Sequence, residues 1–275
     1  MTRRVVFNAD DLGMAPEIDA AVFAVARAGV VREASLCVTG ASAESAMAQA
    51  KQLPAGVGLH FCLTEGQALS GPLRGLTDRR GRFLPLEGVL ASCLARVPLA
   101  GEVERELALQ LGRARELGAS LTHLNGHHHV HLFPVVRDAV LAVLEREGSL
   151  HVRVPPLRPS GEGLRGRLLA RFARALSSAA RQRGVVLRTL PLWGMSLLGR
   201  ADHAAAFDTR LQALPDEAVE WVVHPRSSSG RRRRLSLATD AGPEELATLT
   251  RPDLLERLAR LGIAPASYAE AHSSS

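Results

Sequence analysis

The sequence contains few cysteines, few aromatic residues and a single lysine. Its three cysteines, Cys37, Cys62 and Cys93, are an odd number without close pairing, so they fit neither a disulfide framework nor a zinc finger. No apolar run reaches the length of a transmembrane helix, and the N-terminus has the features of neither a signal peptide nor a membrane anchor. We therefore expect a cytoplasmic protein.

The composition bounds the size of the core and the kind of partner. With 275 residues, 46% of them hydrophobic, the chain can bury the core of one large domain. The formal net charge of +6 is carried almost entirely by arginine and favours anionic partners, although the arginines are spread widely. We expect one domain over residues 1–275, with a long loop at about 67–98 and an exposed basic loop at about 227–236.

Short β-rich runs alternate with segments whose apolar residues have helical spacing. The expected strands are 4–9, 35–39, 56–61, 121–125, 151–154, 185–190 and 220–223. The expected helices are 18–28, 43–53, 101–117, 133–147, 164–182 and 244–261. This alternation predicts right-handed βαβ units and an α/β fold with about seven parallel strands, which fits both an open doubly wound sheet and a (β/α) barrel.

The positions of reactive polar residues favour the TIM-like barrel. Most of the expected strands end in or carry such residues, namely Asp10, Asp11, His60, Asn125, His127, Arg153 and His224. In a (β/α) barrel the C-terminal ends of the strands converge on one mouth, whereas an open sheet would hold its edge strands far from a shared site.

Two of these strand ends can be explained either by metal binding or by a purely structural role. Adjacent carboxylates at Asp10 and Asp11 suit a metal, with one binding the cation and the other free to take a proton; an aspartate before an apolar helix is also a common N-cap. His60 can be a ligand or a hydrogen-bonded core residue, and Cys62, on the same face of its strand, is expected to fill space in the core.

The stretch THLNGHHHVHLFP, residues 122–134, holds five of the ten histidines of the chain. Gly126 interrupts the strand there, so the histidines need not have one common role. One or two can bind metal, and others can orient those ligands through hydrogen bonds. Asp with two His as ligands leaves coordination positions open for water and substrate, which is typical of catalytic metal sites; structural sites close all four positions.

Such a site supports hydrolysis. A metal lowers the pKa of bound water toward about 7, and a nearby carboxylate can deprotonate that water as it attacks a carbonyl. A second acid, for which we expect a histidine, must then protonate the leaving amine.

Four motifs stand in order along the chain: NADDLG (8–13), GLHFCLTEG (58–66), HLNGHHHVHLFP (123–134) and VVHP (222–225). Together they resemble the YdjC-like family of carbohydrate deacetylases, which includes chitooligosaccharide deacetylase, over essentially the whole chain. Within the family the sequence is most similar to the hopanoid-biosynthesis-associated branch, on APEIDAAV, EASLCVTG and the HLN form of the histidine motif. The resemblance implies a distorted (β/α) barrel, one divalent metal ion (Mg²⁺ or Zn²⁺) and removal of N-acetyl groups from amino sugars.

The resemblance also implies a role for each matching residue. It makes Asp11, His60 and His127 the metal ligands, Asp10 the general base and His224 the general acid. Arg153 matches an arginine that we expect to bind the substrate or the oxyanion. His129 is expected to line the site, whereas His123, His128 and His131 are expected to be structural or to orient the ligands. Family members with HLDSHHHVH carry Asp and Ser where this chain has Asn125 and Gly126. This difference leaves the expected ligands intact but affects the residues that hydrogen-bond to them, and with these the metal preference.

The expected substrate is an N-acetylated amino sugar: a chitooligosaccharide, another small sugar, or a glucosamine head group on a hopanoid lipid. The Arg-rich helix at 164–182 is apolar on one face, which fits either contact with a membrane lipid or an ordinary barrel helix. A homodimer is also compatible with the sequence. The alternatives are a metal-dependent phosphoesterase, which usually needs two metals and more ligands, and a non-enzymatic nucleic-acid binder using Arg231–Arg234, which no stacking or binding motif supports.

Overall fold

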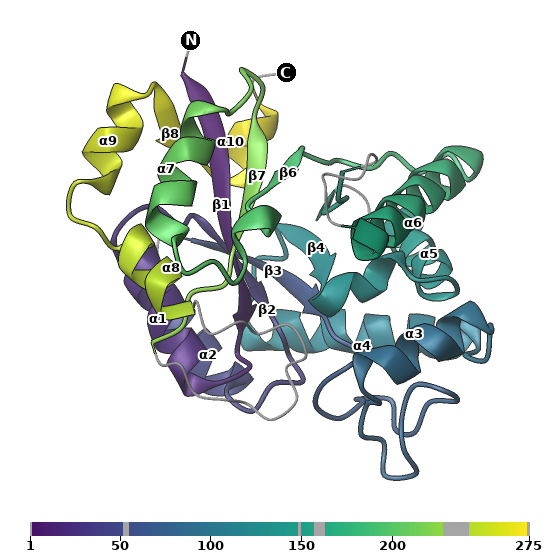
Figure 1. Ribbon diagram of the computed structural model, residues 1–275. Coiled ribbons are helices and arrows are strands. Elements are labelled where there is room, and N and C mark those ends of the chain that lie inside the picture. Colours follow the sequence, from purple (N-terminus) through teal and green to yellow (C-terminus); the bar gives the residue numbers. More distant parts are fainter. Residues whose placement is uncertain (1, 52–54, 148–149, 157–162, 228–241, 274–275) are drawn as a thin grey trace.

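The computed structural model describes residues 2–51, 55–147, 150–156, 163–227 and 242–273. In these parts of the chain, eight parallel strands form one sheet that curls into a distorted barrel (Figure 1). The sheet order is β5-β4-β3-β2-β1-β7-β6, and β8 pairs with β1 outside this path. The strands are β1 (Arg3–Leu12), β2 (Glu33–Leu36), β3 (Gly56–Phe61), β4 (His123–Gly126), β5 (His151–Val152), β6 (Leu192–Trp193), β7 (Val219–Val223) and β8 (Ile263–Pro265). The predicted α/β barrel is therefore confirmed.

β1 pairs with three other described strands and is covered on both faces. Its run Val5, Val6 and Phe7 is fully buried, as expected for a parallel strand between helices and a barrel interior. β7 occupies one edge of β1. The other edge is shared: β8 pairs with its first three residues and β2 pairs from Asn8 onward.

The barrel is least regular between the two ends of the sheet path. Arg188 forms a single parallel bridge with His151, and its carbonyl accepts a 2.8 Å hydrogen bond from the backbone N–H of Val152. A few residues later, β6 pairs with β7. The extended segment 188–193 thus joins the two ends of the sheet with very few backbone hydrogen bonds, which accounts for the distortion.

Helices cover the outside of the sheet (Figure 1). Those before the histidine-rich stretch are α1 (Pro16–Arg27), α2 (Ala43–Ala50), α3 (Leu86–Leu94) and α4 (Ala100–Leu117). Those after it are α5 (Val136–Glu147), α6 (Gly163–Gln182), α7 (His203–Gln212), α8 (Gly242–Leu249), α9 (Leu254–Arg260) and α10 (Tyr268–His272). The apolar face expected for the long helix α4 is the buried one: Val103, Leu107, Leu111 and Ala114 are at most 1% exposed.

Three of the expected strands and helices differ clearly from the observed ones, and the loop expected at about 67–98 contains the helix α3. The segment 185–190 makes only the bridge at Arg188, and regular pairing begins at Leu192, after Pro191. The segment 244–261 is two helices, α8 and α9, because Pro252 lacks the N–H that a continuous helix needs. The strand after α1 ends at Leu36, and the backbone turns at residues 38–40. The basic loop expected at about 227–236 lies outside the described residues from 228 onward.

Among the described helices, none combines the length and the apolar character that crossing a membrane requires.

Candidate metal centre and catalytic pocket

The interior of the barrel is polar, and this polarity follows from the two-residue period of the strands. Alternate residues of five strands point inward and are polar and buried: Asn8 and Asp10, Glu33 and Ser35, His123 and Asn125, His151 and Arg153, and Glu220. Gly58 on β3 provides room for them, since a Cβ there would lie 2.4 Å from Nδ1 of His123. The polar interior leads up to the C-terminal ends of the strands, where barrel active sites lie.

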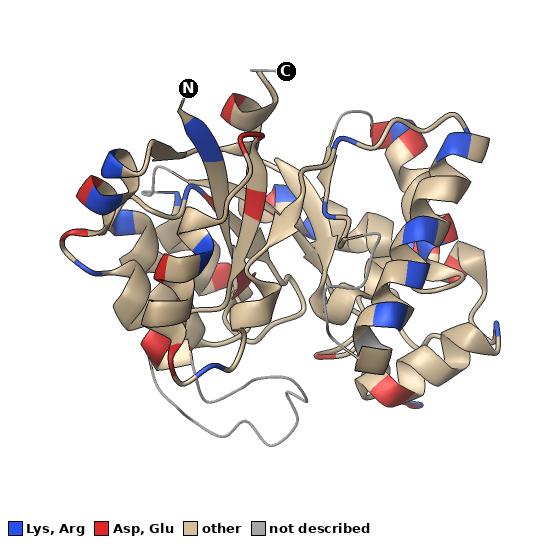
Figure 2. Cartoon of the chain, turned by 45° about the horizontal axis from the view of Figure 1, so that its top comes forward, with Lys and Arg blue, Asp and Glu red and all other residues tan. Residues whose placement is uncertain are grey.

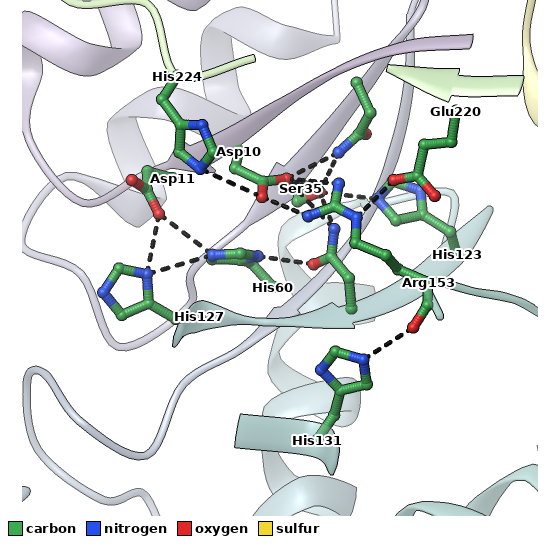
Figure 3. Close-up of polar contacts among 12 residues, drawn as sticks. Asp10, Asp11, Ser35, His60, His123, His127, His131, Arg153, Glu220 and His224 are labelled. Carbon is green, nitrogen blue, oxygen red and sulfur yellow. Dashed lines mark hydrogen bonds and ion pairs between the residues drawn. The ribbon is translucent and has the colours of Figure 1, made fainter. Parts of the chain in front are cut away.

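An irregularity in β1 brings two adjacent carboxylates to the same site. Neighbouring residues of a regular strand point to opposite faces. The register between β1 and β2 shifts between Ala9 and Leu12, and Asp11 has a φ of 68°, in the left-handed region. This bulge turns Asp11 so that its carboxylate joins the pocket that also contains Asp10 (Figure 3). The strained residue is therefore a candidate ligand.

Three side chains from three strand ends form a compact cluster. Asp11 Oδ1 lies 3.1 Å from His60 Nε2 and 3.0 Å from His127 Nδ1, and the two ring nitrogens are 3.3 Å apart (Figure 3). Among the described residues this is the group of three whose ligand atoms could hold a metal ion. Ligands about 2.0–2.2 Å from one cation are separated by roughly 3.0–3.5 Å, so the spacing fits a single bound ion.

The electrostatics of the cluster also favour a cation. Burial alone would raise the pKa of Asp11, but the imidazoles of His127 and His60 hold it well below its usual value. Burial alone would lower the pKa of His127, yet the charge of Asp11 raises it to about 9. The buried carboxylate thus attracts positive charge to this point, as a proton on His127 or as a metal ion. A Mg²⁺ or Zn²⁺ ion would accept these oxygen and nitrogen ligands, although two imidazoles suit Zn²⁺ better.

Asp10 lies beside the cluster and is held by several donors. Arg153 donates to both carboxylate oxygens, with its Nη2 2.9 Å from Oδ1. Asn8, Ser35 and Asn125 also donate to Oδ1, at 2.8, 3.0 and 3.2 Å. Burial alone would raise the pKa of Asp10, but the Arg153 guanidinium holds it well below the usual value, so the side chain is a carboxylate at neutral pH.

Arg153 is buried between two carboxylates. Its side chain is 1% exposed, and its Nε donates to Glu220 on β7 while its terminal nitrogens face Asp10 (Figure 3). Burial alone would raise the pKa of Glu220, but Arg153 lowers it to about 2. The guanidinium is thus held between two carboxylates, and Arg153 also lines the pocket that contains the cluster. Direct contact of Arg153 with a substrate stays a prediction.

His224 follows β7 and reaches the other oxygen of Asp10. Its Nε2 lies 3.5 Å from Asp10 Oδ2, and its side chain is 29% exposed, far more than the three candidate ligands. Its backbone N–H donates to Glu245 on α8. An imidazole that is both open to the pocket and close to Asp10 can exchange a proton with a substrate.

The other histidines of the stretch 123–131 have separate environments. His129 lines the same pocket as the cluster, as expected. His128 also lines this pocket, and its Nδ1 lies 3.1 Å from the hydroxyl of Thr64. His131 donates from Nε2 to the backbone carbonyl of Arg153, 2.8 Å away, and thereby supports β5.

His123 belongs to a buried hydrogen-bonded chain that the sequence did not reveal. Ser35 Oγ lies 2.8 Å from His123 Nε2, and Thr122 Oγ1 lies 2.9 Å from its Nδ1 and donates to Glu33. Burial lowers the pKa of His123 to about 3, so the ring is neutral. Polar residues at alternate positions of strands that are otherwise apolar are the signal that could have identified Ser35, Glu33 and Glu220.

The pocket around the cluster adjoins two larger cavities. It shares Met195 with a cavity of about 1110 Å³ between α6 and the segment 185–196, which is lined mainly by apolar residues. It shares His128 with a cavity of about 910 Å³, whose lining includes Thr64, Gln67 and Arg82. A substrate bound at the cluster therefore has room on two sides.

Together, these observations define a parallel α/β barrel whose pocket, at the C-terminal ends of its strands, could hold one cation beside a carboxylate and an imidazole. The family model described as YdjC-like protein matches residues 4–260, and the chain belongs to this family.

Several relatives are carbohydrate deacetylases. The chain is 30% identical over 272 residues to the carbohydrate deacetylase of Geobacillus stearothermophilus, with 98% of each chain covered. It is 39% identical to the carbohydrate deacetylase of Brevibacillus brevis, over 55% of this chain and 59% of the relative. It is 37% identical to the carbohydrate deacetylase of Mus musculus, over 58% of this chain and 52% of the relative. The chain thus spans a little more than half the length of these last two relatives.

Two solved structures have the same fold. A proposed cellobiose-phosphate cleavage protein of Enterococcus faecalis V583 superposes with a TM-score of 0.71 at 19% identity and covers 98% of this chain and 99% of its own. An uncharacterized protein of Agrobacterium tumefaciens C58 gives a TM-score of 0.52 at 14% identity over 98% and 89%. At these identities the likeness shows the fold alone.

Proposed function

We propose that the protein is a metal-dependent hydrolase that removes the N-acetyl group from an N-acetylglucosamine-containing carbohydrate or glycolipid and releases acetate. The observation that carries this proposal is the cluster of Asp11, His60 and His127 beside Asp10 and His224 in one pocket. The deacetylase names of the relatives support the same reaction.

In this mechanism Asp11, His60 and His127 hold one divalent ion. When bound, the ion polarises the amide carbonyl and makes water a better nucleophile at neutral pH. Asp10 takes a proton from the attacking water, and His224 gives a proton to the leaving nitrogen. Because Asp10 Oδ2 and His224 Nε2 are 3.5 Å apart, the proton can pass between them and restore both groups after each turnover.

Arg153 orients Asp10 in this proposal. Its two terminal nitrogens face both oxygens of the carboxylate, which fixes the plane of that group. Its burial between two carboxylates supports this role, and its place in the pocket wall is also compatible with the binding of substrate or oxyanion that the resemblance implies.

The substrate is either an oligosaccharide or an amphiphilic glycoside. The side chains of Thr64, Gln67 and Arg82 in one neighbouring cavity suit further sugar units, whereas the leucines and valines that line the cavity beside α6 suit a lipid aglycone such as a hopanoid. Arginines are spread along α6 (Figure 2), which contains no acidic residue, and Arg167, Arg171, Arg174 and Arg181 are exposed. This charge would favour contact with an anionic membrane surface. The buried positions of Phe172 and Leu176 equally suit an ordinary barrel helix.

Acetate release from a panel of substrates tests the proposal. The panel consists of free N-acetylglucosamine, N,N′-diacetylchitobiose and an N-acetylglucosaminyl lipid, each assayed after chelation and after addition of Mg²⁺ or Zn²⁺. We expect metal-dependent release of acetate from at least one of them. A phosphodiester control addresses the alternative of phosphoesterase activity, and a gel-shift titration with RNA and DNA at several salt concentrations addresses nucleic-acid binding. Hydrolysis of the phosphodiester without release of acetate from any substrate of the panel would refute the proposed deacetylase activity.

A further inference from the structure

Asn125, on β4, contacts both the candidate metal ligands and the proposed base. Its side chain is completely buried. Its Oδ1 lies 2.6 Å from Nδ1 of His60, and its Nδ2 lies 2.8 Å from Ser35 Oγ and 3.2 Å from Asp10 Oδ1. One amide therefore bridges a candidate ligand and a catalytic carboxylate.

The two ends of this amide are not interchangeable, since the oxygen only accepts and the nitrogen only donates hydrogen bonds. Asp10 Oδ1 is a carboxylate oxygen and requires donors around it. If Asn125 were flipped, its carbonyl oxygen would face this carboxylate in a buried site, with loss of a hydrogen bond and repulsion between the oxygens. The charge of Asp10 thus directs the NH₂ group of Asn125 toward itself and the carbonyl toward His60.

The orientation of Asn125 in turn fixes where the proton of His60 lies. A carbonyl oxygen 2.6 Å from Nδ1 requires that nitrogen to carry a hydrogen. In a neutral ring, Nε2 then has a free lone pair, and Nε2 is the atom that faces Asp11 and His127. This is the tautomer that a metal ligand must have.

We propose that Asn125 is a positioning residue that uses the negative charge of Asp10 to hold His60 in the tautomer with a hydrogen on Nδ1, so that the metal site is preformed. The importance of this tautomer for catalysis rests on the proposed function, whereas the tautomer itself does not.

A matched pair of variants tests this inference. Asn125→Leu removes the acceptor of His60. Asn8→Leu is the control. Asn8, like Asn125, donates to Asp10 (2.8 Å) and to Ser35 (2.7 Å), but its described hydrogen bonds do not include His60. The tautomer is read from ¹⁵N shifts of the His60 ring in metal-free protein at alkaline pH, and the Zn²⁺ dissociation constant is measured by competition with a chelator.

We expect wild type and Asn8→Leu to carry the hydrogen on Nδ1. In Asn125→Leu we expect loss of this preference and Zn²⁺ binding weakened by about 10- to 100-fold, as is typical when the partner of a ligating histidine is removed. An unchanged tautomer and an unchanged Zn²⁺ affinity in Asn125→Leu would overturn the inference.

If Asn125→Leu does not fold, Asn125→Asp provides the second test. It keeps an acceptor for His60 but loses both donors and adds a charge next to Asp10. We expect it to keep the tautomer and the metal while kcat for acetate release falls and KM changes little; loss of the tautomer in this variant would contradict the inference. Absence of acetate release by the wild type, with the tautomer and affinity results as expected, would refute only the proposed function.

Discussion

Arg153 and Asp10 form a buried, two-pronged ion pair in which one guanidinium edge faces both oxygens of the carboxylate. The remaining Nε is directed at Glu220, so the arginine is fixed from both sides. A lysine ammonium is a point charge and cannot reproduce this fork.

We therefore expect Arg153→Lys to lower kcat for acetate release by about 10- to 100-fold, the typical effect of losing a supporting contact. The Zn²⁺ dissociation constant should not change, because the described side-chain partners of Arg153 are Asp10 and Glu220 rather than the candidate metal ligands. Steady-state kinetics and chelator competition measure the two quantities, and a wild-type kcat would show that the fork does not orient Asp10.

Replacing Asp10 itself separates the base from the ligands. Asp10→Asn keeps the size of the side chain but cannot take a proton from water. We expect the variant still to bind metal, with an affinity lowered by at most about 10- to 100-fold because Asn125 loses the charge that orients it. At saturating metal we expect turnover to fall by about 10²- to 10⁴-fold, the usual contribution of a general base. Metal content by elemental analysis and acetate release, both at saturating metal, measure the two quantities; a variant that binds no metal even then would contradict the division of roles between Asp10 and Asp11.

His127→Ala addresses the ligand set. Its Nδ1 is one of the three clustered ligand atoms, so we expect metal affinity to fall by more than about 100-fold, beyond what the loss of a supporting contact produces. His129→Ala is the matched control, because His129 lines the pocket but lies outside the cluster. Equal metal occupancy in the two variants would rule out His127 as a ligand.

His224→Ala tests the proposed acid. We expect slower release of the amine by about 10²- to 10⁴-fold with the metal still bound. The defect should shrink with an acetanilide whose leaving group is a weakly basic aniline, because such an amine needs less help from an acid. Equal loss of rate on both kinds of amide would point instead to a structural effect of the substitution.

Glu33 makes stability depend on pH. Burial raises its pKa from 4.5 to about 6, so the protonated side chain stabilises the fold fully below about pH 4.5 and this stabilisation is lost as the pH rises through 6. The loss amounts to roughly 2 kcal/mol. We expect Glu33→Gln, which cannot ionise, to gain this amount relative to wild type between pH 4.5 and 7. Urea denaturation at both pH values measures the difference, and parallel pH profiles would argue against the effect.

The sequence predicted the strand-end residues well because they follow from a local pattern. Apolar runs that end in Asp11, His60 and His224 identify strand ends, and parallel barrel topology then brings those ends together. Distances within the cluster could not be predicted. They depend on the bulge that gives Asp11 its positive φ, and nothing in the composition of β1 distinguishes a bulged strand from a regular one.

The environment of Arg153 was harder to predict than its position. The sequence places an arginine after a short strand, but its partners come from β1 and β7, which are far away in the chain. The same holds for Ser35, whose four hydrogen-bond contacts come from three other residues of the barrel interior and from Asp10. Such contacts depend on three-dimensional packing rather than on local sequence.

The pairing of β8 with the first residues of β1 has a consequence for how the chain folds during synthesis. During synthesis β1 emerges long before residues 263–265, which cover one of its edges. Contacts between such distant segments slow folding, and an uncovered strand edge invites association with other chains. This edge of β1 therefore stays without its β8 partner until residues 263–265 have left the ribosome.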